Sequence, residues 1–270
     1  MPTSGKRAGA TNGFGGLRHL DRFAGGPASA MQTFLYPYAF RDVCRFEDDF
    51  LVDTINLDYW TTNAGTGATA WAVPATPGFG GTITAATGTD ATAGNRVVNL
   101  YGPPIYRGDN GAGMEVRLQV SANTSIEFSL GFIDTHTTIT TPVVLVPDVD
   151  TPTFAAGMGD AALIHLDTAE TLATAALVCL GSGALNAGSK DALGTYLPTA
   201  ATYLRAKVQI GGDGNQVTGT IQEGDGPETV ASRASGIEGG TLIRPIVVIS
   251  GVTATSRTVT IDYARAWCDR

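Results

Sequence analysis

A chain of 270 residues with 16% charged residues, 25 of them acidic and 17 basic, carries a net charge of −8. Nucleic-acid binding needs clustered Lys and Arg, so this balance excludes nucleic acid as the main partner. No run approaches the roughly 18 apolar residues of a membrane span, and the first 20 residues lack the apolar segment of a signal peptide, which predicts a chain without a membrane partner. The 35 Gly and 13 Pro favour many short strands joined by tight turns.

Residues 1–45 differ from the rest and are expected to form an extended arm. Glycine recurs through this segment without a strand or helix period, which by itself is typical of a flexible tail. Four basic residues against one acidic residue give the first 22 residues a charge of +3. Because such a segment becomes ordered only when something holds it, we expect it to lie across another chain. The basic residues are Lys6, Arg7, Arg18 and Arg22.

The arm ends in an aromatic cluster, and Pro37 within it prevents a central strand. One interpretation is that the cluster covers an end of the following domain. The other is that it anchors the arm in a neighbouring subunit, where Tyr and Phe are enriched. Its members are Phe34, Tyr36, Tyr38 and Phe40.

Residues 46–270 alternate strand and turn patterns and indicate a single all-β domain. Every second residue from Leu204 to Ile210 is apolar or small, the pattern of a half-buried strand. Hairpin signals follow that strand, so we expect the strands after residue 203 to be adjacent antiparallel neighbours. The expected strands are 97–101, 114–120, 125–133, 161–166, 175–180, 203–210, 217–222, 243–250 and 258–267.

Two segments between these strands, 61–95 and 134–160, are rich in Gly, Thr, Pro and Ala. They are expected to be long loops. Loops of this length are where binding or subunit contacts tend to lie.

The two ends of the domain carry its most informative motifs. Residues 46–50 predict an apolar strand, and 57–60 a turn anchored by its Trp. Residues 259–267 read Val-Thr-Ile-Asp-Tyr-Ala-Arg-Ala-Trp. Their alternation, with every second side chain from Val259 to Tyr263 on one face, predicts a half-buried strand.

These motifs resemble the first and last strands of the concanavalin A-like lectin and glucanase jelly roll. The resemblance covers residues 46–268 and implies a two-sheet antiparallel jelly-roll sandwich whose first and last strands lie in one sheet. It says little about activity, because function lies in sites carried by a fold rather than in the fold.

Three cysteines, Cys44, Cys179 and Cys268, form no even disulfide framework and no metal-ligand spacing. The favoured interpretation is free, mostly buried thiols in a reducing cytoplasm. Under the strand pairing that the resemblance implies, Cys44 and Cys268 could be neighbours.

Enzymes of this family carry two Glu and an Asp on one strand face, as E-x-D-x-x-E or E-x-D-x-E, to act as nucleophile and general acid. In this chain Glu115 and Glu127 each stand alone. His19, His136 and His165 are scattered, and no nucleophile elbow or phosphate loop is recognisable. We therefore expect a non-enzymatic protein without catalytic residues or a cofactor.

Some jelly rolls of this kind hold a structural calcium near the seam of the first and last strands, where Asp48, Asp49 and Asp262 are candidate oxygen ligands. The alternative, which we favour, is that these carboxylates cap turns or pair with Arg45 or Arg265. We expect no metal site.

An acidic sandwich with a basic arm and no catalytic set resembles the jelly-roll virion proteins of tailed bacteriophages. This resemblance implies a capsid decoration or minor capsid protein, assembled in the host cytoplasm, whose basic residues and aromatic cluster dock on the major capsid protein or other virion subunits. A homotrimer is the expected assembly. Deleting residues 1–33 should leave the domain folded but abolish incorporation.

The alternative is a carbohydrate- or receptor-binding module of a phage fibre that recognises a surface glycan. Trp71, Tyr101 and Tyr106 are the aromatic residues expected to stack on sugar rings. Whether such rings are exposed on a concave face or buried between subunits discriminates between the two functions.

Overall fold

The structure is a computed structural model. It describes residues 43–51, 54–57, 59–75, 81–134, 142, 144–146, 154–155, 157–168, 175–181, 184–193, 198–212, 216–234, 237 and 240–269. Within these ranges no helix is long and apolar enough to cross a membrane. The residues predicted to dock the arm lie outside the described residues: Lys6, Arg7, Arg18, Arg22, Phe34, Tyr36, Tyr38 and Phe40.

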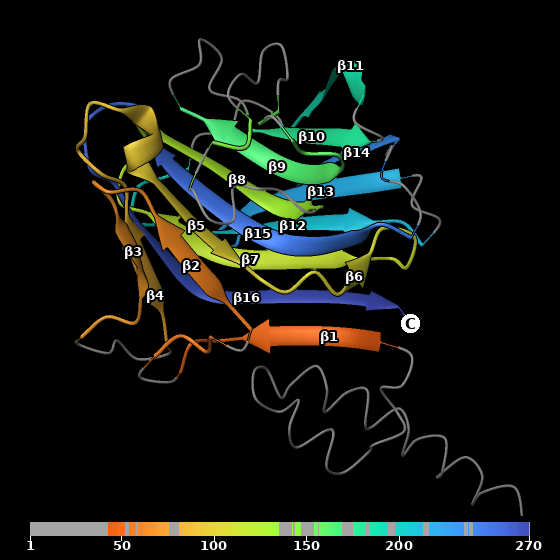
Figure 1. Ribbon diagram of the computed structural model, residues 1–270, viewed down its shortest axis with the longest axis horizontal. Coiled ribbons are helices and arrows are strands. Elements are labelled where there is room, and N and C mark those ends of the chain that lie inside the picture. The colour runs from red at the N-terminus through yellow and green to blue at the C-terminus, as the bar shows by residue number, and fades with distance from the viewer. Residues whose placement is uncertain are drawn as a thin grey trace, which may run out of the picture.

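The described chain forms two eight-stranded antiparallel sheets, which confirms the predicted all-β jelly-roll sandwich (Figure 1). A short 3-10 turn, η1 (Ala93–Arg96), precedes β5. In order across the sheet, sheet A contains β14 (Thr229–Ala234), β13 (Gln216–Glu223), β12 (Tyr203–Ile210), β7 (Gly113–Val120), β16 (Thr258–Asp269), β4 (Ile83–Ala86) and β3 (Thr69–Ala72), with β1 (Val43–Asp48) also paired to β16. Sheet B contains β11 (Ala184–Ala192), β10 (Ala176–Gly181), β9 (Ala161–Asp167), β8 (Ile126–Ile133), β15 (Leu242–Gly251), β5 (Val97–Tyr101) and β2 (Thr61–Ala64), with β6 (Tyr106–Arg107) also paired to β15.

The first and last strands lie side by side, as predicted. Figure 1 shows β1 running antiparallel along β16. In this ladder Phe46 is opposite Ala266, and Cys44 is opposite Cys268. The two cysteines predicted as neighbours are therefore cross-strand partners in the backbone register. Trp60, the expected anchor of the following turn, is fully buried.

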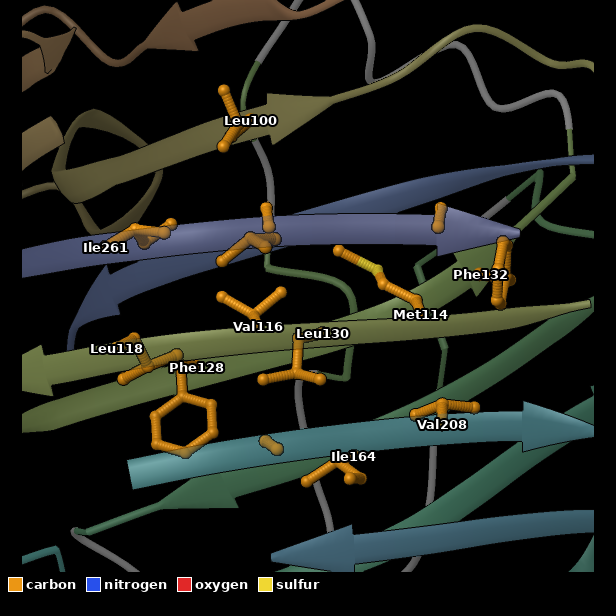
Figure 2. Close-up of a cluster of buried hydrophobic side chains, with 14 of the residues drawn as sticks. Leu100, Met114, Val116, Leu118, Phe128, Leu130, Phe132, Ile164, Val208 and Ile261 are labelled. Atoms are coloured by element: carbon orange, nitrogen blue, oxygen red, sulfur yellow. The ribbon is translucent and has the colours of Figure 1, made fainter. Parts of the chain in front are cut away.

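The main hydrophobic core fills the space between the two sheets. Figure 2 shows side chains of sheet A, such as Val116 and Val208, meeting side chains of sheet B, such as Phe128 and Leu130. Each of these strands contributes every second residue, because successive side chains of a strand point to opposite faces. The predicted alternation of β12 is confirmed, since its apolar residues from Leu204 onward are buried and the residues between them are partly exposed.

Two predictions, one about a loop and one about strand neighbours, are wrong. Residues 61–95, expected to be a loop, contain β2, β3 and β4. These strands have four residues each, too few to show a period, and their burial comes from single residues such as Trp71 and Ile83.

The strands after residue 203 are also not all neighbours. β12, β13 and β14 are consecutive in sheet A, but β15 lies in sheet B between β8 and β5. From Pro245 to Gly251 β15 is buried at every residue, which is typical of a strand covered on both faces.

A second hydrophobic cluster covers the outer face of sheet B. Leu145, Val146 and Met158, from the segment between β8 and β9, pack on alternate residues of the sheet such as Leu163 and Val178. The backbone N–H of Ala155 donates to the carbonyl of Leu145 at 2.9 Å, which ties two parts of this cover together. The outer face of sheet B is thus closed by its own chain.

Candidate binding face on sheet A

The outer face of sheet A carries partly exposed aromatic and charged side chains because of a bulge in β16. Ile261 pairs with Leu118 and Tyr263 pairs with Arg117, so Asp262 is an extra residue in the strand. Up to Ile261 the odd-numbered residues are buried, whereas after the bulge the even-numbered residues are. The prediction that Tyr263 shares a face with Val259 and Ile261 is therefore wrong. Bulges commonly re-aim side chains in this way next to functional sites.

After the bulge, Tyr263, Arg265 and Trp267 point away from the core. Trp267 lies over Gly113 of β7, where a Cβ atom would come within 2.3 Å of Cζ2 of the indole. The ring therefore rests on backbone that only glycine leaves uncovered. Trp267 is partly exposed on this outer face of the sheet.

Polar groups surround this ring. Nζ of Lys207 and Cζ of Arg265 each lie 5.8 Å from a ring centroid of Trp267, within the range of a cation–π interaction. The side-chain amide of Gln209 donates to the carbonyl of Gly111 at 2.9 Å and borders the ring from β12. We call Trp267, Gly113, Lys207, Arg265 and Gln209 the Trp267 platform.

Glu115 links Arg265 of the platform to the neighbouring Tyr263. Its side chain is only 6% exposed and accepts hydrogen bonds from the Tyr263 hydroxyl at 2.5 Å and from Nη2 of Arg265 at 2.8 Å. Burial, followed by this hydrogen bond to Glu115, raises the pKa of Tyr263 well above its usual value. Tyr263 therefore stays protonated as a donor, and Arg265 is fixed beside the indole.

A third aromatic residue continues the row along the face. The guanidinium of Arg117 lies 4.3 Å from the ring centroid of Tyr203 and also pairs with Asp262 at the bulge. Arg205 bonds to Gln222 and Glu228 on the same face. Aromatic rings with adjacent hydrogen-bonding and charged groups form surfaces that bind ligands or partners.

The three aromatic residues expected to stack on sugars are buried. Trp71 and Tyr106 belong to the core between the sheets, and Tyr106 packs 5.7 Å from Phe132. Tyr101 is 7% exposed in the cluster on sheet B, with the guanidinium of Arg244 5.8 Å from its ring. Their predicted role is wrong, because each serves packing.

The covered face of sheet B contains a buried polar row instead. Oγ of Ser129 and Nδ1 of His165 lie 2.9 Å apart, with both side chains at most 1% exposed. Burial lowers the pKa of His165 to about 3, so its imidazole is neutral. Among the described residues, neither Nε2 of His165 nor the side-chain amide of Asn99 has a hydrogen-bond partner. This row is a costly feature of the fold rather than an accessible site.

The carboxylates predicted to stand alone lie in different sheets. Glu115 faces outward from sheet A, whereas Glu127 faces outward from sheet B. Glu127 is directly opposite Asp167 on β9, a pair of carboxylates that is not visible in the sequence because 40 residues separate them. Glu127 is 8% exposed and lies beside the covered polar row.

The three predicted candidates for calcium do not converge into one group. The Asp48 carboxylate accepts a hydrogen bond from the backbone N–H of Phe50 at 2.9 Å, and Asp262 pairs with Arg117. The predicted arginine partners pair elsewhere, Arg45 with Glu47 and Arg265 with Glu115. Over the described parts of the chain, no three His, Cys, Asp or Glu residues are grouped as a metal site requires. Cys179 is buried in the core, and burial raises the pKa of its thiol to about 12.

Comparisons with known proteins identify the fold of the chain. No family model matches the chain, and no curated protein matches its sequence. The carbohydrate recognition domain of Emp47p has a TM-score of 0.53 at 11% identity, covering 84% of this chain and 97% of that one. The catalytic domain of an endo-1,3-β-glucanase (laminarinase) from Thermotoga petrophila has a TM-score of 0.51 at 12% identity, covering 83% and 97%.

A third match is the CBM2 module of the evolved Dit of Lactobacillus casei phage J-1. Its TM-score is 0.50 at 15% identity, covering 84% of this chain and 96% of that one. The fold is the concanavalin A-like jelly roll. At these identities the matches establish the jelly roll alone, and the same fold occurs in a recognition domain and in a catalytic domain.

Proposed function

We propose that this jelly roll is a carbohydrate-binding module. The observation that carries the proposal is the Trp267 platform, in which a partly exposed indole packs closely against the backbone of Gly113. A flat aromatic ring with hydrogen-bonding groups at its edge suits a sugar, whose apolar ring face can stack while its hydroxyl groups bond. The recognition domain and the CBM2 module among the similar structures support this proposal.

The test is binding of the full chain to a panel of immobilised polysaccharides, with Trp267→Ala as the variant. We expect at least a tenfold loss of affinity for the polysaccharide that the wild type binds. Tyr59→Ala is the matched control, because Tyr59 is 47% exposed and lies outside the platform. Unchanged binding by Trp267→Ala, with an unchanged unfolding temperature, would refute the platform as the site.

The proposal places binding rather than hydrolysis at the site. Glu115 is occupied by Tyr263 and Arg265, and Glu127 lies on the other sheet. A retaining glycosidase needs two carboxyl groups about 5–5.5 Å apart on either side of the scissile bond. Release of reducing ends from the bound polysaccharide, lost in Glu127→Gln, would overturn this reading.

A structural role in a virion is a second candidate, favoured by an exposed apolar corner beside the end of β1. Leu51, Leu57 and Tyr59 are 59%, 74% and 47% exposed. The rings of Phe46 and Tyr59 lie 4.7 Å apart, which links this corner to β1. Exposed apolar groups of this kind mark interfaces with other proteins.

The partners we propose for this corner are virion subunits or further copies of the chain in a trimer. Light scattering at micromolar concentration tests the trimer. A stable monomer of 27.8 kDa would contradict it.

A further inference from the structure

The proposed carbohydrate site contains a cation that forms no ion pair with the carboxylates of the described residues. Most cations on the outer face of sheet A form ion pairs: Arg45 with Glu47, Arg117 with Asp262, Arg205 with Glu228, and Arg265 with Glu115. Lys207 has no such pair with any carboxylate of the described chain, and its Nζ lies 5.8 Å from a ring centroid of Trp267. The charge at the edge of the platform is therefore open to a ligand.

The strand register explains why Lys207 forms no ion pair with the carboxylate opposite it. Lys207 lies directly opposite Glu115 on β7 and would be its natural cross-strand partner. Both oxygens of Glu115 are already engaged, Oε1 by the Tyr263 hydroxyl and Oε2 by Arg265. The bulge at Asp262 places Tyr263 and Arg265 on this face, so the same irregularity that exposes Trp267 also displaces Lys207 from its carboxylate.

A lysine ammonium is a compact charge with three donors on a flexible stem, so it can follow an anion on a bound ligand. We propose that the Trp267 platform binds an acidic saccharide of the uronic-acid type, which stacks on the indole and pairs its carboxylate with Lys207. This inference rests on the proposed carbohydrate-binding function. The chain's net charge of −8 repels polyanions at long range, so the attraction comes from this local cation and not from the overall field.

The experiment measures binding of the full chain to polygalacturonate, alginate and hyaluronate, each compared with its carboxyl-reduced, neutral derivative. We expect at least one acidic polymer to bind, and its neutral derivative to bind at least tenfold more weakly. Lys207→Met should lose at least tenfold in affinity for that acidic polymer, whereas Lys207→Arg, which keeps the charge, should retain most of it.

Arg205→Met is the matched control for general electrostatics. Arg205 lies on the same strand and face as Lys207 but is already bonded to Gln222 and Glu228, so its loss should leave affinity within about twofold. Equal loss in Arg205→Met and Lys207→Met would indicate non-specific charge attraction and overturn the inference.

The outcomes separate this inference from the proposed function. If neutral derivatives bind as tightly as the acidic polymers and still need Trp267, the carbohydrate-binding proposal stands and the acidic saccharide is refuted. If acidic polymers bind equally to wild type and Trp267→Ala, the carbohydrate-binding proposal and the acidic-saccharide inference are both refuted at this site. If none of the six polymers binds, the acidic saccharide is refuted, and the wider panel decides the proposed function.

Discussion

The outer faces of the two sheets are built in opposite ways although both belong to one sandwich. On sheet B, apolar residues such as Leu163 and Val178 are covered by a segment of the chain, and even polar residues such as His165 are buried. On sheet A, the residues between the core positions are charged or aromatic and remain partly exposed. One outer face is thus closed by the fold, whereas the other, where the proposed site lies, leaves charged and aromatic side chains partly exposed.

The largest expected loss of stability comes from a substitution on the covered face of sheet B. Leu163→Ala should destabilise the chain by about 2–5 kcal/mol, because a fully buried leucine is lost and a cavity remains. Val230→Ala on sheet A, where Val230 is 56% exposed, should change stability by less than about 0.5 kcal/mol. Urea unfolding of both variants checks the difference, and similar losses would show that the two faces do not differ as described.

Low pH should also destabilise the chain through a residue on the covered face of sheet B. The pKa of His165 is about 3 in the folded chain and about 6.5 when unfolded, so the unfolded state takes up a proton first. The stability contributed by neutral His165 is complete above pH 6.5 and is lost as the pH falls towards 3. At pH 5 the loss relative to pH 7 should be about 2 kcal/mol.

His165→Gln isolates that contribution. The variant should start less stable at pH 7, because Ser129 loses its partner, but should lose less stability between pH 7 and pH 5 than the wild type. Urea unfolding at both pH values measures the two slopes. Equal slopes would show that another group carries the acid sensitivity.

On sheet A, Gly113→Ala sharpens the argument for the platform. The new methyl group would meet the Trp267 ring at 2.3 Å, so the indole must move, at a cost of about 1–3 kcal/mol in stability and at least tenfold in ligand affinity. Tryptophan fluorescence should shift with it. Gly212→Ala, where a Cβ has open space, is the control and should leave affinity and fluorescence unchanged.

The smallest effect is expected from an ion pair on the same open face. Arg117 and Asp262 are 42% and 23% exposed, so solvent screens their attraction. Asp262→Asn should cost less than about 1 kcal/mol. A loss above about 2 kcal/mol in thermal or urea unfolding would mean that this pair, and not the backbone register, maintains the bulge.

The strands with clear periods could be predicted almost to the residue. Residues 97–101 and 203–210 coincide with β5 and β12, and the pairing of the chain ends followed from the motifs around Phe46 and Val259. The short strands β2, β3 and β4 could not be predicted in this way, because four residues rich in Thr and Ala show neither a period nor an apolar run.

The candidate site was only half visible in the sequence. The polar side of β12, with Lys207 and Gln209, follows from its strict alternation. Trp267 does not, because counting every second residue from Val259 through Tyr263 carries the same face across the bulge at Asp262. A motif with adjacent Asp and Tyr in an otherwise regular strand is compatible with a bulge, but the pattern alone does not require one.

The sequence by itself determined the fold class and the inward faces of the regular strands, because apolar alternation is a local property of each strand. Only the tertiary structure decided which rings are buried, which carboxylates meet and which face stays open. Tyr101 shares a buried cluster with Leu145, which lies 44 residues later in the chain. Glu127 lies opposite Asp167 of the next strand, and Glu115, which lies opposite Lys207, bonds instead to residues of β16. These outcomes depend on register between distant segments, where one extra residue reverses every side chain that follows it.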